Sequence, residues 1–142
     1  MELLQKRNVR IMEKAADWKD AVRKSVAPLE EEGYVKPVYK EAIISGIEEL
    51  GPYIVVAPSV ALPHARPERG VLKSQIAITL FKENVEFDKR EVDARLFVAL
   101  AAADSESHLN ALMTISDILQ DENRVKEILE SNDVETLYGY FE

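Results

Sequence analysis

The chain has 142 residues, of which 46% are hydrophobic and 31% charged, and we expect one domain spanning residues 1–142. The formal net charge of −8 argues against nucleic-acid binding, because contacts to phosphates need a basic surface. The sequence has no cysteine, no apolar run that could insert into a membrane and no apolar signal core at the N-terminus, which predicts a cytoplasmic protein without disulfides.

Alternating and helical patterns divide the first third of the chain. Residues 8–12 favour a short edge strand. Apolar residues then recur at helical spacing over 17–33, with Asp17 as the expected N-cap and Pro28 expected to kink or shorten the helix. A second helix is expected to begin with Pro37 in its first turn and to stop before Gly51 and Pro52.

The middle of the chain changes to β-type runs. Strands are predicted over 53–57, 60–62, 75–81 and 95–102, the first two separated by Pro58 and Ser59. Strands this apolar are usually covered on both faces. Asp104 and Ser105 then offer caps for a third helix, and shorter helices are expected over 123–130 and 134–138. The predicted class is α/β, a three-layer sandwich in which a mixed central sheet is flanked by helices on both faces.

The first candidate site is His64 with Arg66, on a short loop bounded by Pro63 and Pro67. A neutral imidazole nitrogen can take a phosphoryl group, and a fixed guanidinium can stabilise the charge on its oxygens. The plain alternative is a loop histidine bonded to a backbone carbonyl, with Arg66 solvated beside Glu68. Spacing alone does not separate these two interpretations.

The second candidate is His108, near the start of the helix that follows the last buried strand. Free N–H groups at a helix start stabilise an anion, so His64 and His108 could face one phosphoryl group if both lie at the same sheet edge. Alternatively, His108 is a polar residue on a surface helix. A third interpretation combines both histidines with Asp104 as an open zinc site, but no zinc-ligand motif supports it, and we expect no metal or organic cofactor.

Longer motifs around these residues resemble a known family. They are Gly-Pro-Tyr-Ile-Val-Val-Ala-Pro at 51–58, Leu-Pro-His-Ala-Arg-Pro-Glu at 62–68, and the later Asp104 with His108, Leu109 and Leu112. In this order they resemble the IIA components of the bacterial phosphoenolpyruvate-dependent sugar phosphotransferase system, of the mannitol/fructose type, and look closest to the ascorbate-specific branch. The resemblance covers nearly the whole chain.

The resemblance implies a cytoplasmic phosphocarrier with the mannitol/fructose IIA fold. His64 would accept a phosphoryl group from HPr and pass it to a IIB component, which serves the membrane IIC component, and His108 would lie beside the phosphorylated ring. Mannitol-type members carry an arginine on the helix before the Pro-His loop, where this chain has Glu48 and Glu49, which leaves Arg66 as the candidate cation. The alternatives are a regulatory phosphoacceptor that controls a target protein, an interaction domain without phosphotransfer, and a small metal hydrolase.

Overall fold

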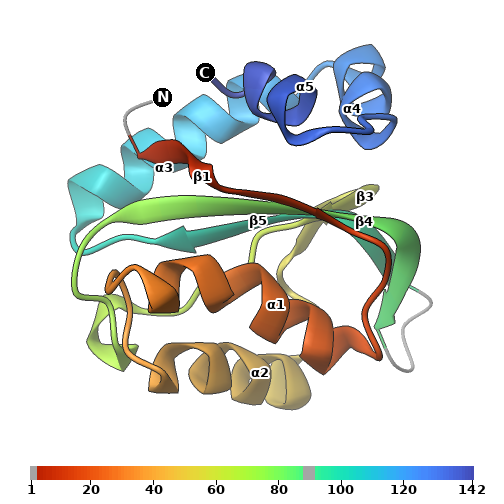
Figure 1. Cartoon of the computed structure of the whole chain (residues 1–142). Coiled ribbons are helices and arrows are strands. Elements are labelled where there is room, and N and C mark those ends of the chain that lie inside the picture. Colours follow the sequence, from red (N-terminus) through yellow and green to blue (C-terminus); the bar gives the residue numbers. More distant parts are fainter. Residues whose placement is uncertain (1–2, 88–91) are drawn as a thin grey trace.

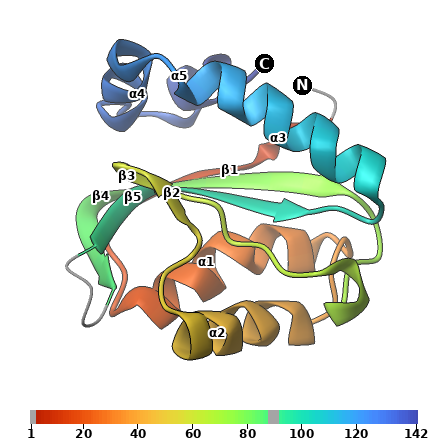
Figure 2. The same cartoon turned by 180° about the vertical axis from the view of Figure 1, so that it is seen from behind.

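A five-stranded sheet lies between two layers of helices in the computed structural model, which describes residues 3–87 and 92–142 (Figure 1 and Figure 2). The strands are β1 (Leu4–Met12), β2 (Val55–Ala57), β3 (Ser59–Ala61), β4 (Gln75–Phe87) and β5 (Val92–Ala101), in the spatial order β1-β4-β5-β3-β2. β1 is parallel to β4 and β3 is parallel to β5, while β4–β5 and β2–β3 are antiparallel. The predicted mixed sheet and three-layer sandwich are confirmed.

Helices cover both faces of the sheet (Figure 1). The first layer holds α1 (Trp18–Glu31) and α2 (Val38–Leu50), and the second holds α3 (Ser105–Leu119), α4 (Glu122–Leu129) and α5 (Val134–Gly139). A 3₁₀ turn, η1 (Pro67–Arg69), lies between β3 and β4 in the sequence. Among the helices of the described residues, none combines the length and the apolarity needed to cross a membrane.

The two faces of the sheet carry separate cores, because successive strand residues point to opposite sides. On β5, Phe97 and Ala99 are buried with α1 and α2, whereas Leu96 and Val98 are buried with the C-terminal helices. Both sets are fully buried. This explains why the strand is apolar at consecutive positions, as expected for a sheet covered on both faces.

The helix boundaries follow local signals in the sequence. The side chains of Asp17 and Asp104 cap α1 and α3, accepting hydrogen bonds from the Asp20 and Ser107 amides at 2.8 and 2.7 Å, so both predicted caps are confirmed. Of the two outcomes expected for Pro28, shortening does not occur, because α1 continues to Glu31, and a kink stays a prediction. The helical bonding continues past the proline, because its carbonyl still accepts from the Glu32 amide at 3.1 Å. Pro28 has no N–H of its own to donate to the preceding turn.

The outer part of the β4–β5 hairpin was not evident from the sequence. Strand β4 runs six residues beyond the predicted end at Phe81, and β5 begins at Val92 rather than at residue 95. Residues 82–84 are polar and interrupt the apolar pattern from which the strand was predicted, so the pattern gives no sign that the strand continues. It is held by backbone pairing and by burial of Phe87, whose ring lies 5.8 Å from that of Trp18.

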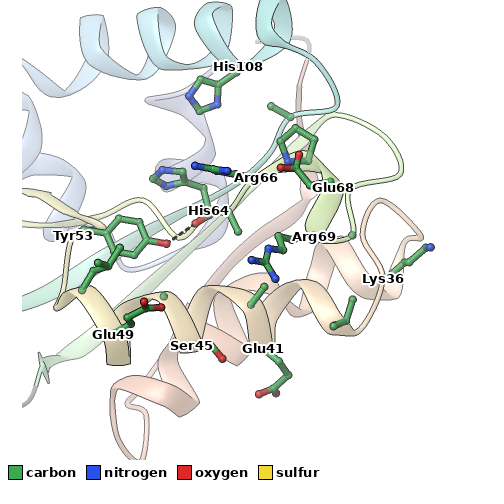
Figure 3. Close-up of a pocket in the computed structure, with 18 of the residues that line it drawn as sticks. Lys36, Glu41, Ser45, Glu49, Tyr53, His64, Arg66, Glu68, Arg69 and His108 are labelled. Carbon is green, nitrogen blue, oxygen red and sulfur yellow. Dashed lines mark hydrogen bonds between the residues drawn. The ribbon is translucent and has the colours of Figure 1, made fainter.

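The predicted strand over 53–57 is shorter than expected. Tyr53 and Ile54 form a turn, in which the Tyr53 amide donates to the Gly51 carbonyl at 2.7 Å and the Val55 amide to the Pro52 carbonyl at 3.1 Å. Only Val55–Ala57 pairs with β3. The turn directs the Tyr53 side chain toward the loop that follows β3 (Figure 3).

Candidate active site

The order of the strands brings the predicted site residues to one edge of the sheet. β3 leads into the loop that carries His64 and Arg66, and β5 leads into α3, whose first turn carries His108. Since β3 and β5 are parallel neighbours, their carboxyl ends meet at the same edge. All three side chains line one groove of about 1190 Å³ (Figure 3).

The imidazole of His64 has one nitrogen engaged and the other available. Nδ1 lies 2.5 Å from the carbonyl oxygen of Leu62. A carbonyl oxygen can only accept, so Nδ1 carries a proton, and in the neutral form of the ring Nε2 carries the lone pair. The side chain is half-buried on the wall of the groove. This is the tautomer required for a nucleophile that attacks through Nε2.

The second imidazole lies directly across from the first. The ring centroids of His64 and His108 are 6.1 Å apart, with an interplanar angle of 51°. His108 is half-buried, and its own amide bonds to the Asp104 carbonyl at 3.1 Å. Hydrogen bonds from Ser107 lower the pKa of the Asp104 carboxyl, which caps the helix. The two rings therefore lie close enough for both to contact one small group bound at the edge of the groove.

Three cationic residues of the described part of the chain line the groove, one from the loop, one from η1 and one from the segment before α2. In Figure 3 the guanidinium of Arg66 points toward the imidazole of His64. Arg69 and Lys36 also line the groove, which the sequence did not single out. Glu49 of α2 lines the same groove, whereas Glu48 pairs with Lys19 at 3.1 Å.

Two tyrosine hydroxyls hold the loop that carries His64. Tyr39, expected only as a core residue, is fully buried, and its hydroxyl donates to the Leu100 carbonyl at 2.8 Å and accepts from the Ala65 amide at 3.0 Å. Burial raises the pKa of Tyr39 to about 12. The hydroxyl of Tyr53 donates to the His64 carbonyl at 3.0 Å, and its ring meets the imidazole edge-on at 5.8 Å. Burial also raises the pKa of Tyr53, so both hydroxyls are protonated at neutral pH.

The zinc interpretation has no geometric support within residues 3–87 and 92–142. These residues contain no group of three histidine, cysteine, aspartate or glutamate side chains that could hold a metal ion. The carboxylate of Asp104, the third ligand in that interpretation, accepts the cap hydrogen bond of α3.

The layered mixed sheet is shared with solved structures of IIA proteins. The family described as phosphoenolpyruvate-dependent sugar phosphotransferase system, EIIA 2, matches residues 2–142, and the chain belongs to this family.

Similar proteins carry two different substrate names. The chain is 34% identical over 122 residues to the mannitol-specific cryptic phosphotransferase enzyme IIA component of Escherichia coli K12, covering 86% of this chain and 83% of the relative. It is also 34% identical over 122 residues to the ascorbate-specific EIIA component of the same strain, covering 84% and 79%. These two relatives do not distinguish the predicted ascorbate branch from the mannitol one.

A solved complex of a IIA protein has the same fold. It contains the mannitol enzyme IIA and phosphorylated enzyme IIB of Escherichia coli, and its match to this chain has a TM-score of 0.84 at 27% identity, covering 98% of each chain.

Proposed function

We propose that this chain is a cytoplasmic IIA phosphocarrier that accepts a phosphoryl group on Nε2 of His64 and passes it to a IIB component. The observation that carries the proposal is the His64 ring, whose Nδ1 is bonded to the Leu62 carbonyl while its Nε2 is left as the lone-pair nitrogen. Family membership supplies the class of reaction, and the mannitol IIA complex with phosphorylated IIB supports the acceptor. The donor is phospho-HPr, as the resemblance implies.

In the proposed step, the Nε2 lone pair attacks the phosphorus of the donor's phosphohistidine. The new N–P bond forms as the donor's N–P bond breaks, and the electron pair of the broken bond returns to the donor imidazole. The second step repeats this exchange toward IIB. The Nδ1–H group keeps donating its hydrogen bond to the Leu62 carbonyl, and this bond stabilises the positive charge that the ring acquires as Nε2 bonds to phosphorus.

Arg66 and His108 act on the phosphoryl oxygens in this proposal. The transferred group carries its charge on three equatorial oxygens, so catalysis depends on positioning and on charge stabilisation. The guanidinium of Arg66 supplies a fixed positive charge with paired donors. His108, facing His64 across 6.1 Å, donates a hydrogen bond to one oxygen.

The test is phosphorylation by enzyme I, HPr and phosphoenolpyruvate, followed by intact-mass measurement. We expect one added phosphoryl group that is lost in acid, and no addition in His64→Ala. Retention of the label by His64→Ala contradicts the assignment. Arg66→Gln is expected to slow transfer about 100- to 1,000-fold, as removal of one charge-stabilising donor does in other enzymes. Arg69→Gln, which removes another cation that lines the groove, is its matched control and should slow transfer much less.

We propose ascorbate as the sugar served, with mannitol as the competing assignment. The carrier itself does not bind the sugar, so its choice of IIB decides the pathway. The measurement is transfer of label from the phosphorylated chain to purified IIB proteins of the ascorbate and mannitol systems. Faster transfer to the mannitol IIB overturns the ascorbate assignment without affecting the role of His64.

A further inference from the structure

The peptide group that joins His64 to Ala65 is held at both of its polar atoms by tyrosine hydroxyls. Its carbonyl accepts from the Tyr53 hydroxyl at 3.0 Å, and its N–H donates to the Tyr39 hydroxyl oxygen at 3.0 Å. The two tyrosines come from different elements, Tyr39 from α2 and Tyr53 from the turn before β2. The dashed line in Figure 3 marks the Tyr53 bond.

We propose that Tyr53 is a positioning residue for phosphoryl transfer, which together with Tyr39 clamps this peptide and thereby fixes the His64 ring with Nε2 available. The inference rests on the proposed function of His64. In this proposal Tyr53 makes no hydrogen bond to the phosphoryl group or to the reacting nitrogen. It acts through its hydrogen bond to the main chain of His64 and through the edge-on contact between the two rings.

The loop needs such a clamp because it lies between regular elements. Strand β3 ends at Ala61 and η1 begins at Pro67, so His64 is outside both. Fixing the peptide after His64 restricts its ψ angle and so the direction of its Cα–Cβ bond. The Nδ1 bond to the Leu62 carbonyl then keeps a single tautomer. Near-attack geometry is sensitive to displacements of about 1 Å.

A glycine on α2 makes room for Tyr53. A Cβ atom at Gly46 would lie 3.2 Å from the Tyr53 hydroxyl oxygen and 3.4 Å from its Cε1. Glycine is less favourable than alanine in a helix interior. The close approach accounts for glycine at this position, since Tyr53 reaches the His64 carbonyl across the bare backbone of the helix.

The direct test is Tyr53→Phe, which removes only the hydroxyl. Transfer from phospho-HPr is measured as separate kcat and KM values, and the His64 tautomer is read from two-bond ¹H–¹⁵N NMR couplings of the free protein. We expect kcat to fall about 5- to 10-fold, as for loss of one neutral hydrogen bond. We expect KM to stay within about two-fold, and a second His64 tautomer to appear. Tyr140→Phe is the matched control, because that hydroxyl contacts Glu127 on α4, which does not line the groove.

Substitution of Gly46 gives a second, independent test of the role of Tyr53. Gly46→Ala should lower kcat in the natural background and have little further effect in Tyr53→Phe, where there is no hydroxyl to displace. Gly139→Ala is its control, since a Cβ there meets nothing within 4 Å. Unchanged kcat and an unchanged tautomer spectrum in Tyr53→Phe overturn the inference, and so does a change confined to KM. If the natural protein takes no phosphoryl group, the proposed function fails, while the NMR measurement still decides the clamp.

Discussion

Removing the Tyr39 hydroxyl should destabilise the whole domain, because it leaves two main-chain groups without a partner. In Tyr39→Phe the Leu100 carbonyl loses a 2.8 Å hydrogen bond and the Ala65 amide loses a 3.0 Å bond. Leu100 is 1% exposed, so its carbonyl has little access to replacement water. The ring itself is retained, and so the hydrophobic contribution of this fully buried side chain changes little.

The magnitude follows from these two groups. An unsatisfied buried carbonyl costs about 1–3 kcal/mol, and the half-buried Ala65 amide adds about 0.5–1.5 kcal/mol because water can reach it in part. Together the free energy of unfolding should fall by about 2–4 kcal/mol. For a chain of this length, each kcal/mol lowers Tm by roughly 2–4 °C, which gives a fall of about 10 °C.

Urea denaturation is the appropriate assay, followed by the fluorescence of Trp18, the single tryptophan of the chain. Trp18 is 6% exposed and contacts Phe87, so unfolding changes its surroundings strongly. The m-value should be unchanged, because the fold is the same in both proteins. A loss below about 1 kcal/mol at constant m would refute the reasoning that the hydroxyl satisfies both groups.

Two further predictions concern stability. Since the pKa of Tyr39 is about 12 in the folded protein and about 10 in an unfolded chain, its contribution is complete below pH 10 and is lost as the pH rises toward 12. The free energy of unfolding should fall by roughly 3 kcal/mol between pH 10 and pH 12, and Tyr39→Phe should lack this fall. An equal loss of stability in both proteins over this pH range would contradict the assignment to Tyr39. Phe141→Ala should lower the free energy of unfolding by about 3–5 kcal/mol, because Phe141 is 1% exposed in the core beneath the C-terminal helices. Urea denaturation should still show a single transition. Separate loss of α5, followed by circular dichroism, would contradict one cooperative core.

Local signals were sufficient for most of the fold. The Asp17 and Asp104 caps, the apolar runs of β4 and β5 and the helical spacing of apolar residues each depend on neighbours within one or two turns. The extension of the hairpin depends instead on contacts between distant segments. Phe87 is buried against Trp18, 69 positions away in the sequence, and no local pattern reports such a contact.

The sequence predicted which residues form the candidate site, but it predicted their closeness only on the condition that two strands end at the same edge of the sheet. The sequence placed His64 after one strand and His108 after another, but their meeting depends on β3 lying beside β5 and parallel to it. The tyrosine clamp was missed for a related reason. Its bonds join Tyr39 to residues 26 and 61 positions away, and the periodicity that identifies Tyr39 as a core residue does not report what its hydroxyl contacts.

The charges on α2 give a physical reason to expect the phosphoryl-stabilising cation on the loop. Three charged residues of this helix form salt bridges with residues of α1. The pairs are Lys40 with Glu30, Glu41 with Arg23, and Glu48 with Lys19. These pairs join the two helices to each other, and the remaining charge, Glu49, faces the groove with the wrong sign to stabilise a phosphoryl group. Helix α2 therefore supplies no cation to this site. Of the cations that line the groove, Lys36 precedes α2 and Arg69 lies on η1, whereas Arg66 points toward His64 from the loop that the two tyrosines hold in place.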